Sequence, residues 1–321
     1  MYIEQDSLTK LSVMSNKWLS DLYNKENKRI FHYTSQDVLL LILNNETLRF
    51  SDRFYLNDKT EGAYRMNLMI ERMNEIIPDK SRLATCREEL VNKCRDYIKE
   101  IKDDKFMVYQ CSFSMNGDNL PLWNYYTKNN EMHGVCIGFD SKELASSINE
   151  NISRAKDVGK KQLFVLGGPV IYDTEEQVNI IKEYIEEYEK IIFENIPDNC
   201  NPISKAKHFF GVVLSRIALA GTFFKMKCFS PEEEYRLAVY LLNEDGNFVA
   251  FEKKQVKYVS RYDFYLPCTD LSIDLSCIKS IVLSPTYNFE NMSSNMRDML
   301  RRYNIDNDEV EIIQSQIPVR Y

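Results

Sequence analysis

The sequence predicts one α+β domain with helical insertions, and three observations support this fold class. Strand-like segments lie near both ends of the chain, at about 29–33 and 309–314, while the long helical segments lie between them. Pairs of polar residues at positions i and i+2 stand in apolar, strand-like sequence. No internal repeat, low-complexity tract or Pro/Gly/Ser-rich linker divides the chain, so we treat 1–321 as a single domain.

The first half of the chain alternates helices with short strands. Residues 7–26 have the pattern of a polar helix, and Ser35 is placed to cap a helix that runs through Asn44. The buried side of that helix is expected to consist of Val38, Leu39, Ile42 and Leu43. A first helical insertion covers about 62–102 and is broken at Pro78. The other elements expected in this half are strands at 29–33, 47–50, 106–113, 133–139 and 169–172, and a short helix that begins near Pro121.

A second helical insertion covers about 174–224. The helix at 174–195 is acidic and carries one apolar stripe at spacings of three and four, formed by Val178, Ile181, Ile185, Tyr188 and Ile192. The helix at 203–224 is more uniformly apolar, which predicts that it is buried. The elements expected after it are strands at 234–242, 247–251, 255–263, 278–284 and 309–314, and a helix at about 291–303.

Composition excludes several classes of protein. The chain contains only 10 Gly and no glycine-rich phosphate-binding motif, while its basic residues are scattered and its formal net charge is −7, so a duplex-binding protein is not expected. Eight cysteines without a CxxC pattern favour reduced thiols. The first residues lack a secretory signal, and the apolar stretch at 211–224 is too short to span a bilayer. We therefore expect a cytoplasmic protein that is not embedded in a membrane.

Three polar clusters on predicted strands indicate a binding site. They are His32-Tyr33-Thr34 on an early strand, the pair Ser112 and Ser114, and the pair Glu232 and Glu234. Because alternate residues of a strand project from one face, each pair can line a cleft. Together the clusters predict a site for a sugar phosphate or a nucleotide.

The structural alternatives to this site remain open. His32 can reach a ligand or bond a backbone carbonyl, and the 57–61 segment can contact a ligand through Asn57 or Asp58 or form only a helix-capping turn. Trp123 and Tyr126 lie three residues apart on one predicted helix face, as a stacking platform or as core. The run that contains Glu232 and Glu234 can also be a solvated charge cluster, although Arg236 is placed to hold Glu234 ionised. The three histidines share no metal-ligand spacing, so no metal site is expected.

These segments, in order, resemble the uncharacterised bacterial family DUF2971. The motifs that carry the resemblance lie at 32–35, 48–52, 57–61, 112–114, 123–126, 133–140, 232–236 and 278–285, so that it extends from about 30 to 290. The family often has Pro after Asn-Asp and Trp upstream of Glu-x-Glu, where this chain has Lys59 and the segment 228–230. Neither departure removes a proposed polar group.

The His-Tyr-Thr, Ser-x-Ser and Glu-x-Glu segments are in turn similar to the signature of ADP-ribosyltransferases, which hold NAD in a cleft of a split β-sheet. That similarity implies a split mixed or antiparallel sheet, with Glu234 as the catalytic carboxylate and Glu232 positioning or deprotonating an acceptor. Trp123 or Tyr126 would stack on nicotinamide, and Arg53 or Arg236 would meet the pyrophosphate. The residues implied in NAD binding are His32, Tyr33, Thr34, Arg53, Asn57, Asp58, Ser112, Ser114, Trp123, Tyr126 and Arg236.

The resulting hypothesis is an enzyme that cleaves NAD and passes ADP-ribose to an unknown protein, nucleic acid or water, a chemistry that fits a toxin or phage-defence effector. One alternative is a Mg²⁺-dependent nuclease or phosphodiesterase that uses Asp58, Glu61 and Glu234. Another is a non-catalytic module that binds a protein partner through the acidic helix at 174–195. In that case the apolar stripe of this helix would be exposed.

Overall fold

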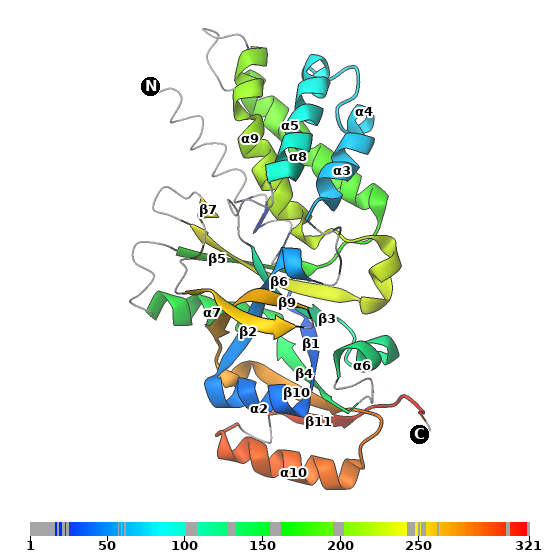
Figure 1. The fold of residues 1–321 in the computed structure, drawn as a ribbon, viewed down its shortest axis with the longest axis vertical. Coiled ribbons are helices and arrows are strands. Elements are labelled where there is room, and N and C mark those ends of the chain that lie inside the picture. The colour runs from blue at the N-terminus through cyan, green and yellow to red at the C-terminus, as the bar shows by residue number, and fades with distance from the viewer. Residues whose placement is uncertain are drawn as a thin grey trace.

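A computed structural model describes most of the chain (Figure 1). The described residues are 17, 19–20, 23, 26–56, 58, 60, 62–100, 108–127, 133–154, 162–194, 202–242, 248–249, 251, 255–261, 263–305 and 309–319. Most of the predicted helix at 7–26 lies outside them, as do Asn57 and Glu61.

The core of the fold is an 11-stranded mixed sheet. Its main path runs β11-β10-β4-β1-β3-β2-β9-β8, and β6 pairs with β3, β5 and β7. All pairs are antiparallel except β10 with β11. The strands are β1 (Arg29–Thr34), β2 (Thr47–Asp52), β3 (Tyr109–Ser114), β4 (Val135–Asp140), β5 (Gln162–Pro169), β6 (Glu234–Leu242), β7 (Phe248–Val249), β8 (Lys257–Arg261), β9 (Phe264–Ser272), β10 (Ile278–Leu283) and β11 (Glu311–Gln314). The sheet combines strands from both ends of the chain, which confirms the predicted α+β class.

The sheet divides at β3. One edge of β3 pairs with β6 along its whole length, from Tyr109↔Val239 to Ser114↔Glu234. Its other edge pairs with β1 only at Ser114, and with β2 only at Tyr109 and Gln110. Between these contacts, the 111–113 backbone faces a gap between β1 and β2. Residues on both sides of this gap line a cavity.

Five helices form a layer at one end of the sheet, at the top of Figure 1. They are α3 (Tyr64–Glu71), α4 (Met73–Ile76), α5 (Arg87–Glu100), α8 (Thr174–Glu194) and α9 (Pro202–Ala220). Their apolar faces make a hydrophobic cluster separate from the one that fills the sheet. The apolar stripe of α8 lies inside this cluster: Val178, Ile181, Ile185, Tyr188 and Ile192 are all buried. The alternative in which this stripe is an exposed docking surface is therefore wrong.

The remaining helices cover the sheet or border it. They are α2 (Gln36–Asn45), α6 (Leu120–Tyr126), α7 (Ser141–Arg154) and α10 (Phe289–Arg302). Ser35 caps α2 as predicted, because its Oγ accepts a hydrogen bond from Val38 N at 3.3 Å. Leu39, Ile42 and Leu43 face the core, but Val38 is exposed, so the predicted buried face was one residue too wide.

Three elements differ from the sequence prediction for identifiable reasons. The polar helix α7 was missed because only a few of its side chains, among them Leu144 and Ile148, enter the core. Strand β5 was not predicted: the strand expected at 169–172 shares only Pro169 with it, and Gly167 and Gly168 interrupt the apolar pattern of β5. The single strand expected at 255–263 is the first strand of the hairpin β8–β9, and the long partner β9 was not predicted.

Two general features of the chain can be stated for the described residues. The seven cysteines among them are all free thiols, and Cys228 is the exposed one of the seven. None of the described helices combines the length and the apolarity that crossing a membrane requires.

Candidate functional site

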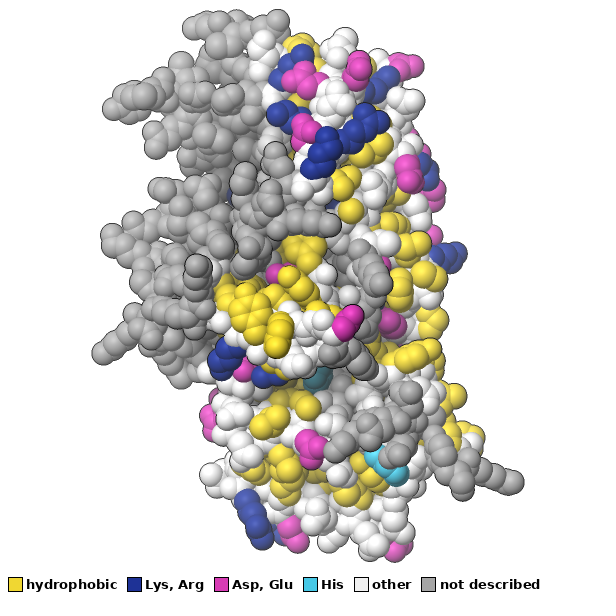
Figure 2. All heavy atoms as spheres, viewed as in Figure 1, with side chains coloured by type: hydrophobic (Ala, Val, Ile, Leu, Met, Phe, Trp, Pro, Cys, Tyr) yellow, Lys and Arg dark blue, Asp and Glu magenta, His cyan; other side chains and the backbone are white. Residues whose placement is uncertain are grey.

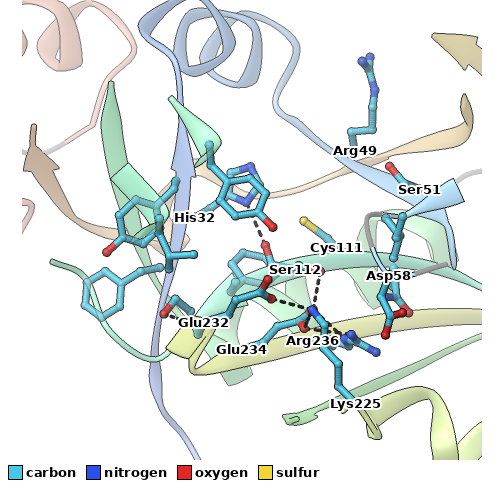
Figure 3. Close-up of a pocket in the computed structure, with 18 of the residues that line it drawn as sticks. His32, Arg49, Ser51, Asp58, Cys111, Ser112, Lys225, Glu232, Glu234 and Arg236 are labelled. Carbon is cyan, nitrogen blue, oxygen red and sulfur yellow. Dashed lines mark hydrogen bonds and ion pairs between the residues drawn. The ribbon is translucent and has the colours of Figure 1, made fainter. Parts of the chain in front are cut away.

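The gap in the sheet opens into a cavity of about 230 Å³ (Figure 3). Its walls come from β1, β2, β3, β6 and β8, from α6, and from the segment that precedes β6. The lining residues are Phe31, His32, Tyr33, Arg49, Ser51, Leu56, Asp58, Gln110, Cys111, Ser112, Phe113, Ser114, Leu122, Tyr126, Lys225, Glu232, Glu234, Arg236 and Arg261. The three polar clusters predicted from the sequence therefore meet at one place.

His32 bridges the gap in the sheet. Its Nδ1 lies 3.2 Å from the Ser112 carbonyl oxygen, across the unpaired edge of β3. A carbonyl oxygen only accepts hydrogen bonds, so Nδ1 carries the proton and Nε2 is left as an acceptor. Burial lowers the pKa of His32, although the bond to Ser112 offsets part of this effect. At neutral pH the imidazole is therefore uncharged and can accept a hydrogen bond from a hydroxyl group.

Glu234 is the most strongly held charge in the cavity. Arg236 donates two hydrogen bonds to the Glu234 carboxylate, from Nε at 2.7 Å and from Nη2 at 2.9 Å. Ser112 Oγ donates to the same carboxylate at 2.7 Å, and Lys225 Nζ donates at 2.9 Å. Burial would raise the pKa of Glu234, but Arg236 and Lys225 outweigh it and lower the pKa to about 2. The predicted pairing of Arg236 with an ionised Glu234 is present.

Lys225 joins the two glutamates. Its Nζ lies 2.6 Å from Glu232 Oε2 as well as 2.9 Å from Glu234 Oε2, and it stands 4.7 Å from the centre of the Phe229 ring. Burial alone would lower the pKa of Lys225, but the two carboxylates raise it above its ordinary value. Lys225 is therefore a fixed cation that sets the separation of Glu232 and Glu234.

The geometry of the Glu-x-Glu segment differs from the prediction. Glu232 ends the 3-10 helix η5 (Lys227–Glu232), Glu233 has a left-handed backbone with φ 45°, and β6 begins only at Glu234. The two carboxylates are consequently not alternate residues of one strand face. They meet because the chain turns at Glu233 and because both bind Lys225. The Glu232 side chain is 23% exposed, against 4% for Glu234.

A loop at 115–119 holds this turn in place. Met115 N donates to the Glu233 carbonyl at 2.7 Å, and Asn119 Nδ2 donates to the Pro231 carbonyl at 2.8 Å. Ser114 Oγ, whose residue precedes the loop, donates to the Glu232 carbonyl at 2.8 Å. These bonds fix the backbone on both sides of Glu232, so Ser114 serves the site by positioning that residue.

The predicted aromatic platform is divided between core and cavity. Trp123 is fully buried, packs edge-on against Tyr33 at 4.9 Å and donates from Nε1 to Asp118 at 2.9 Å. Trp123 does not line the cavity, because its indole fills the space behind β1. Tyr126, which is 38% exposed, does line the cavity. The one helix face predicted for the pair is thus split, and of the two residues Tyr126 is the one at the cavity.

Two other predicted binding residues lie outside the cavity. Thr34 is buried at the end of β1, where its carbonyl approaches Gly134. Arg53 is 1% exposed, and its guanidinium carbon stands 4.9 Å from the centre of the Phe54 ring. Arg53 begins a 3-10 turn after β2, and its side chain lies in the interior and does not line the cavity. The prediction that Arg53 meets a pyrophosphate therefore has no support from its position.

The far end of the cavity contains residues that the sequence analysis did not assign. Arg49 and Ser51 alternate on β2, and Arg261 comes from the edge strand β8. Arg49 and Ser51 follow the same i, i+2 pattern that identified Ser112 and Ser114, so this signal was present in the sequence. Lys225 and Arg261 stand in no comparable pattern. Asp58, which was predicted, also lies at this end (Figure 3).

The described residues do not form a metal site. No group of three or more His, Cys, Asp or Glu among them is arranged to hold an ion. Within the cavity, Arg236 and Lys225 already occupy the carboxylate oxygens of Glu234. The Mg²⁺ alternative also needs Glu61, which lies outside the described residues.

One comparison with known proteins gave a match. Residues 122–237 match the model of a family described as a protein of unknown function (DUF2971), which confirms the family assignment over part of the stretch in which the motifs were found. No curated protein and no solved structure matches the chain significantly. The matched residues run from α6 to β6 and include Lys225, Glu232, Glu234 and Arg236.

Proposed function

We propose that this chain, a member of the DUF2971 family, is an ADP-ribosyltransferase-like enzyme that cleaves NAD and passes ADP-ribose to a macromolecule or to water. The observation that supports the proposal best is that His32, Ser112, Tyr126, Glu232 and Glu234 surround one cavity in the gap of a divided sheet. Groups from the first and last thirds of the sequence meet there, and they are the groups that the ADP-ribosyltransferase similarity implies.

The charges of the cavity suit the cleavage of a nicotinamide glycosidic bond. Breaking this bond develops positive charge on the ribose, as in sugar hydrolysis, and a fixed carboxylate nearby stabilises that charge. Glu234 is ionised, but four donor atoms already occupy its carboxylate. Glu232 is more exposed and has a single cationic partner, Lys225. We therefore assign Glu232 as the residue that contacts the ribose. Glu234 is assigned to positioning, because it holds Lys225 and Arg236 in place.

His32 and Tyr126 complete the proposed site. The free Nε2 of neutral His32 can accept a hydrogen bond from a ribose hydroxyl. Tyr126 offers a partly exposed ring against which nicotinamide can stack. Because the cavity volume of about 230 Å³ is below the ~300 Å³ at which sites for drug-sized ligands begin, it would enclose one end of NAD while the rest extends through its mouth.

The test is nicotinamide release from NAD by the purified protein, with Glu232→Gln as the informative variant. The substitution removes the charge of Glu232 but keeps its size, so we expect the rate to fall about 10²- to 10³-fold. Glu233→Gln is the matched control: it changes the adjacent glutamate, which is exposed and accepts from Asn116 Nδ2 at 3.0 Å, a bond that a glutamine oxygen can keep.

Two results would contradict the proposal. The first is an absence of nicotinamide when water, protein and nucleic acid are each supplied as acceptor. The second is equal activity of the Glu232→Gln and Glu233→Gln variants. Insensitivity of the activity to a chelator would separate it from the Mg²⁺-dependent alternative.

A further inference from the structure

A buried glutamine connects the helical layer to the cation that lies between the two glutamates of the cavity. We propose that Gln177 is a positioning residue: its side-chain amide fixes the backbone of Lys225, and Lys225 in turn holds the carboxylate of Glu232. The inference rests on the proposed function only for the reaction in which Glu232 takes part. Three observations support it, namely the place of Gln177 at the start of α8, the hydrogen bonds of its buried amide, and the contacts of Lys225.

Gln177 reaches the site because of how α8 begins. Asp173 Oδ1 accepts a hydrogen bond from Glu176 N at 2.9 Å, as a residue that caps the first turn of a helix does. Gln177 N donates to the Asp173 carbonyl at 3.0 Å, so Gln177 lies in that first turn. The turn follows Ile171, which pairs with Phe224 in an isolated parallel bridge. The start of α8 thus places Gln177 beside the segment that leads into β6.

The amide of Gln177 is buried and bonded at both of its polar atoms. Its Nε2 donates to the Ile171 carbonyl at 2.6 Å and to the Lys225 carbonyl at 3.1 Å. Its Oε1 accepts from the hydroxyl of Tyr64, the first residue of α3, at 3.0 Å. Carbonyl oxygens only accept hydrogen bonds, so the amide nitrogen must face them. Because Gln177 is 0% exposed, losing any of these partners costs free energy, and the bonds hold the segment in one position.

Lys225 carries this constraint into the cavity. Its N donates to the Ile171 carbonyl at 3.2 Å and its carbonyl accepts from Gln177, so its backbone is held at both polar atoms. Its side chain is 7% exposed, and Nζ lies 2.6 Å from Glu232 Oε2 and 2.9 Å from Glu234 Oε2. Three further hydrogen bonds hold the carboxylate of Glu234. A shift of Lys225 would therefore displace Glu232 more than Glu234.

The helical layer thus contributes to the site through its interior. Acidic and basic side chains are mixed on the outer surface of this layer, at the top of Figure 2. Exposed pairs of this kind contribute little to the fold. Gln177 and Tyr64 are neutral side chains that join α8 and α3 to the cavity without placing another charge near Glu232.

The test applies two readouts to the whole chain with Gln177→Met, which removes the amide and nearly keeps the length of the side chain. The first readout is reductive methylation of Lys225 followed by mass spectrometry, which depends on no activity. We expect its rate to rise about tenfold relative to that of Lys257, which is 64% exposed in the same molecule. The second readout is nicotinamide release, for which we expect kcat to fall about 10- to 100-fold while KM stays within about threefold of the wild type.

Tyr188→Phe is the matched control. Tyr188 is also buried on α8 and donates to a backbone carbonyl, that of Ala206, at 2.8 Å. Its loss weakens the helical layer without removing a contact of Lys225, so both readouts should stay within about twofold of the wild type. Tyr64→Phe is a milder variant that keeps both donors of Gln177 and remains measurable if Gln177→Met does not fold. It should change both readouts in the direction of Gln177→Met, by about two- to fivefold.

Each outcome has a defined meaning. The inference is overturned if Lys225 is methylated no faster in Gln177→Met and Tyr64→Phe than in the Tyr188→Phe control. Faster methylation of Lys225 in a chain that releases no nicotinamide would support the role of Gln177 in holding Lys225 and remove the proposed function. Nicotinamide release that depends on Glu232 but keeps its kcat in Gln177→Met would do the reverse.

Discussion

The two ends of the cavity differ in how their charges are satisfied. At the carboxylate end, Glu234, Arg236 and Lys225 have side chains that are 4%, 1% and 7% exposed, and each binds an opposite charge within the protein. At the arginine end, Arg49 and Lys257 are 47% and 64% exposed and share a single carboxylate. A charge network that is buried and internally paired must form as the chain folds. Exposed charges contribute little to stability and remain available for a ligand.

This difference separates two kinds of polar residue that look alike in a sequence. The carboxylate end is a preformed structure that the loop at 115–119 and the left-handed turn at Glu233 keep in register. The arginine end is exposed, and the pair of Arg49 with Asp270 contributes little to stability. Substitutions should therefore change the free energy of unfolding strongly at the first end and only slightly at the second.

The largest expected effect is the loss of stability on Glu234→Ala. The substitution leaves Arg236 and Lys225 buried without their shared carboxylate, and breaking a buried ion pair in this way costs about 3–5 kcal/mol. Urea denaturation followed by circular dichroism measures this change directly.

Glu232→Ala is the control for that measurement, because Glu232 is partly exposed and leaves Lys225 paired with Glu234. We expect it to cost less than about 1 kcal/mol. If both variants lost the same free energy of unfolding, the carboxylate end would not be the preformed network described above.

A smaller effect is expected when acid titrates the same carboxylate. The pKa of Glu234 is lowered from 4.5 to about 2, so its ionised form stabilises the folded protein above pH 4.5. That contribution, about 3 kcal/mol, is lost as the pH falls from 4.5 toward 2. The difference in free energy of unfolding between the wild type and Glu234→Gln separates the contribution of Glu234 from those of other titrating groups. This difference should shrink as the pH falls from 4.5 toward 2. A difference that stays constant from pH 5 to pH 3 would contradict the assignment.

Much of this site was predictable from the sequence because its strands carry the alternation that the sheet requires. His32, Ser112 and Glu234 were found from polar residues at strand positions, and the register of β3 with β1 and β6 brings them together. Arg49 and Ser51 show the same i, i+2 alternation on β2, although the sequence analysis did not assign them to the site.

Other features depend on contacts that no local pattern encodes. Lys225 acts through the 3-10 helix that follows it, which brings its side chain between two glutamates. The sheet divides at β3 because β1 pairs with one end of a β3 edge and β2 with the other end of the same edge. This arrangement depends on the register of strands that are far apart in the sequence. Trp123 and Tyr126 were assigned to one helix face, but α6 is only 7 residues long and is rotated so that Trp123 enters the core.

The most direct test of the comparison makes the same substitution at both ends, and the change in stability expected at the arginine end is among the smallest. Arg236→Gln removes a guanidinium that binds both oxygens of Glu234 and also donates to the Thr222 carbonyl, so it should cost about 3–5 kcal/mol. Arg49→Gln removes one partner of an exposed pair and should change the free energy of unfolding by less than about 1 kcal/mol. Denaturation of both variants under the same conditions compares the two ends in one experiment. Equal destabilisation would show that the arginine end is as much a part of the folded core as the carboxylate end, whereas an unchanged free energy of unfolding for Arg49→Gln would show that the fold does not depend on the Arg49–Asp270 pair.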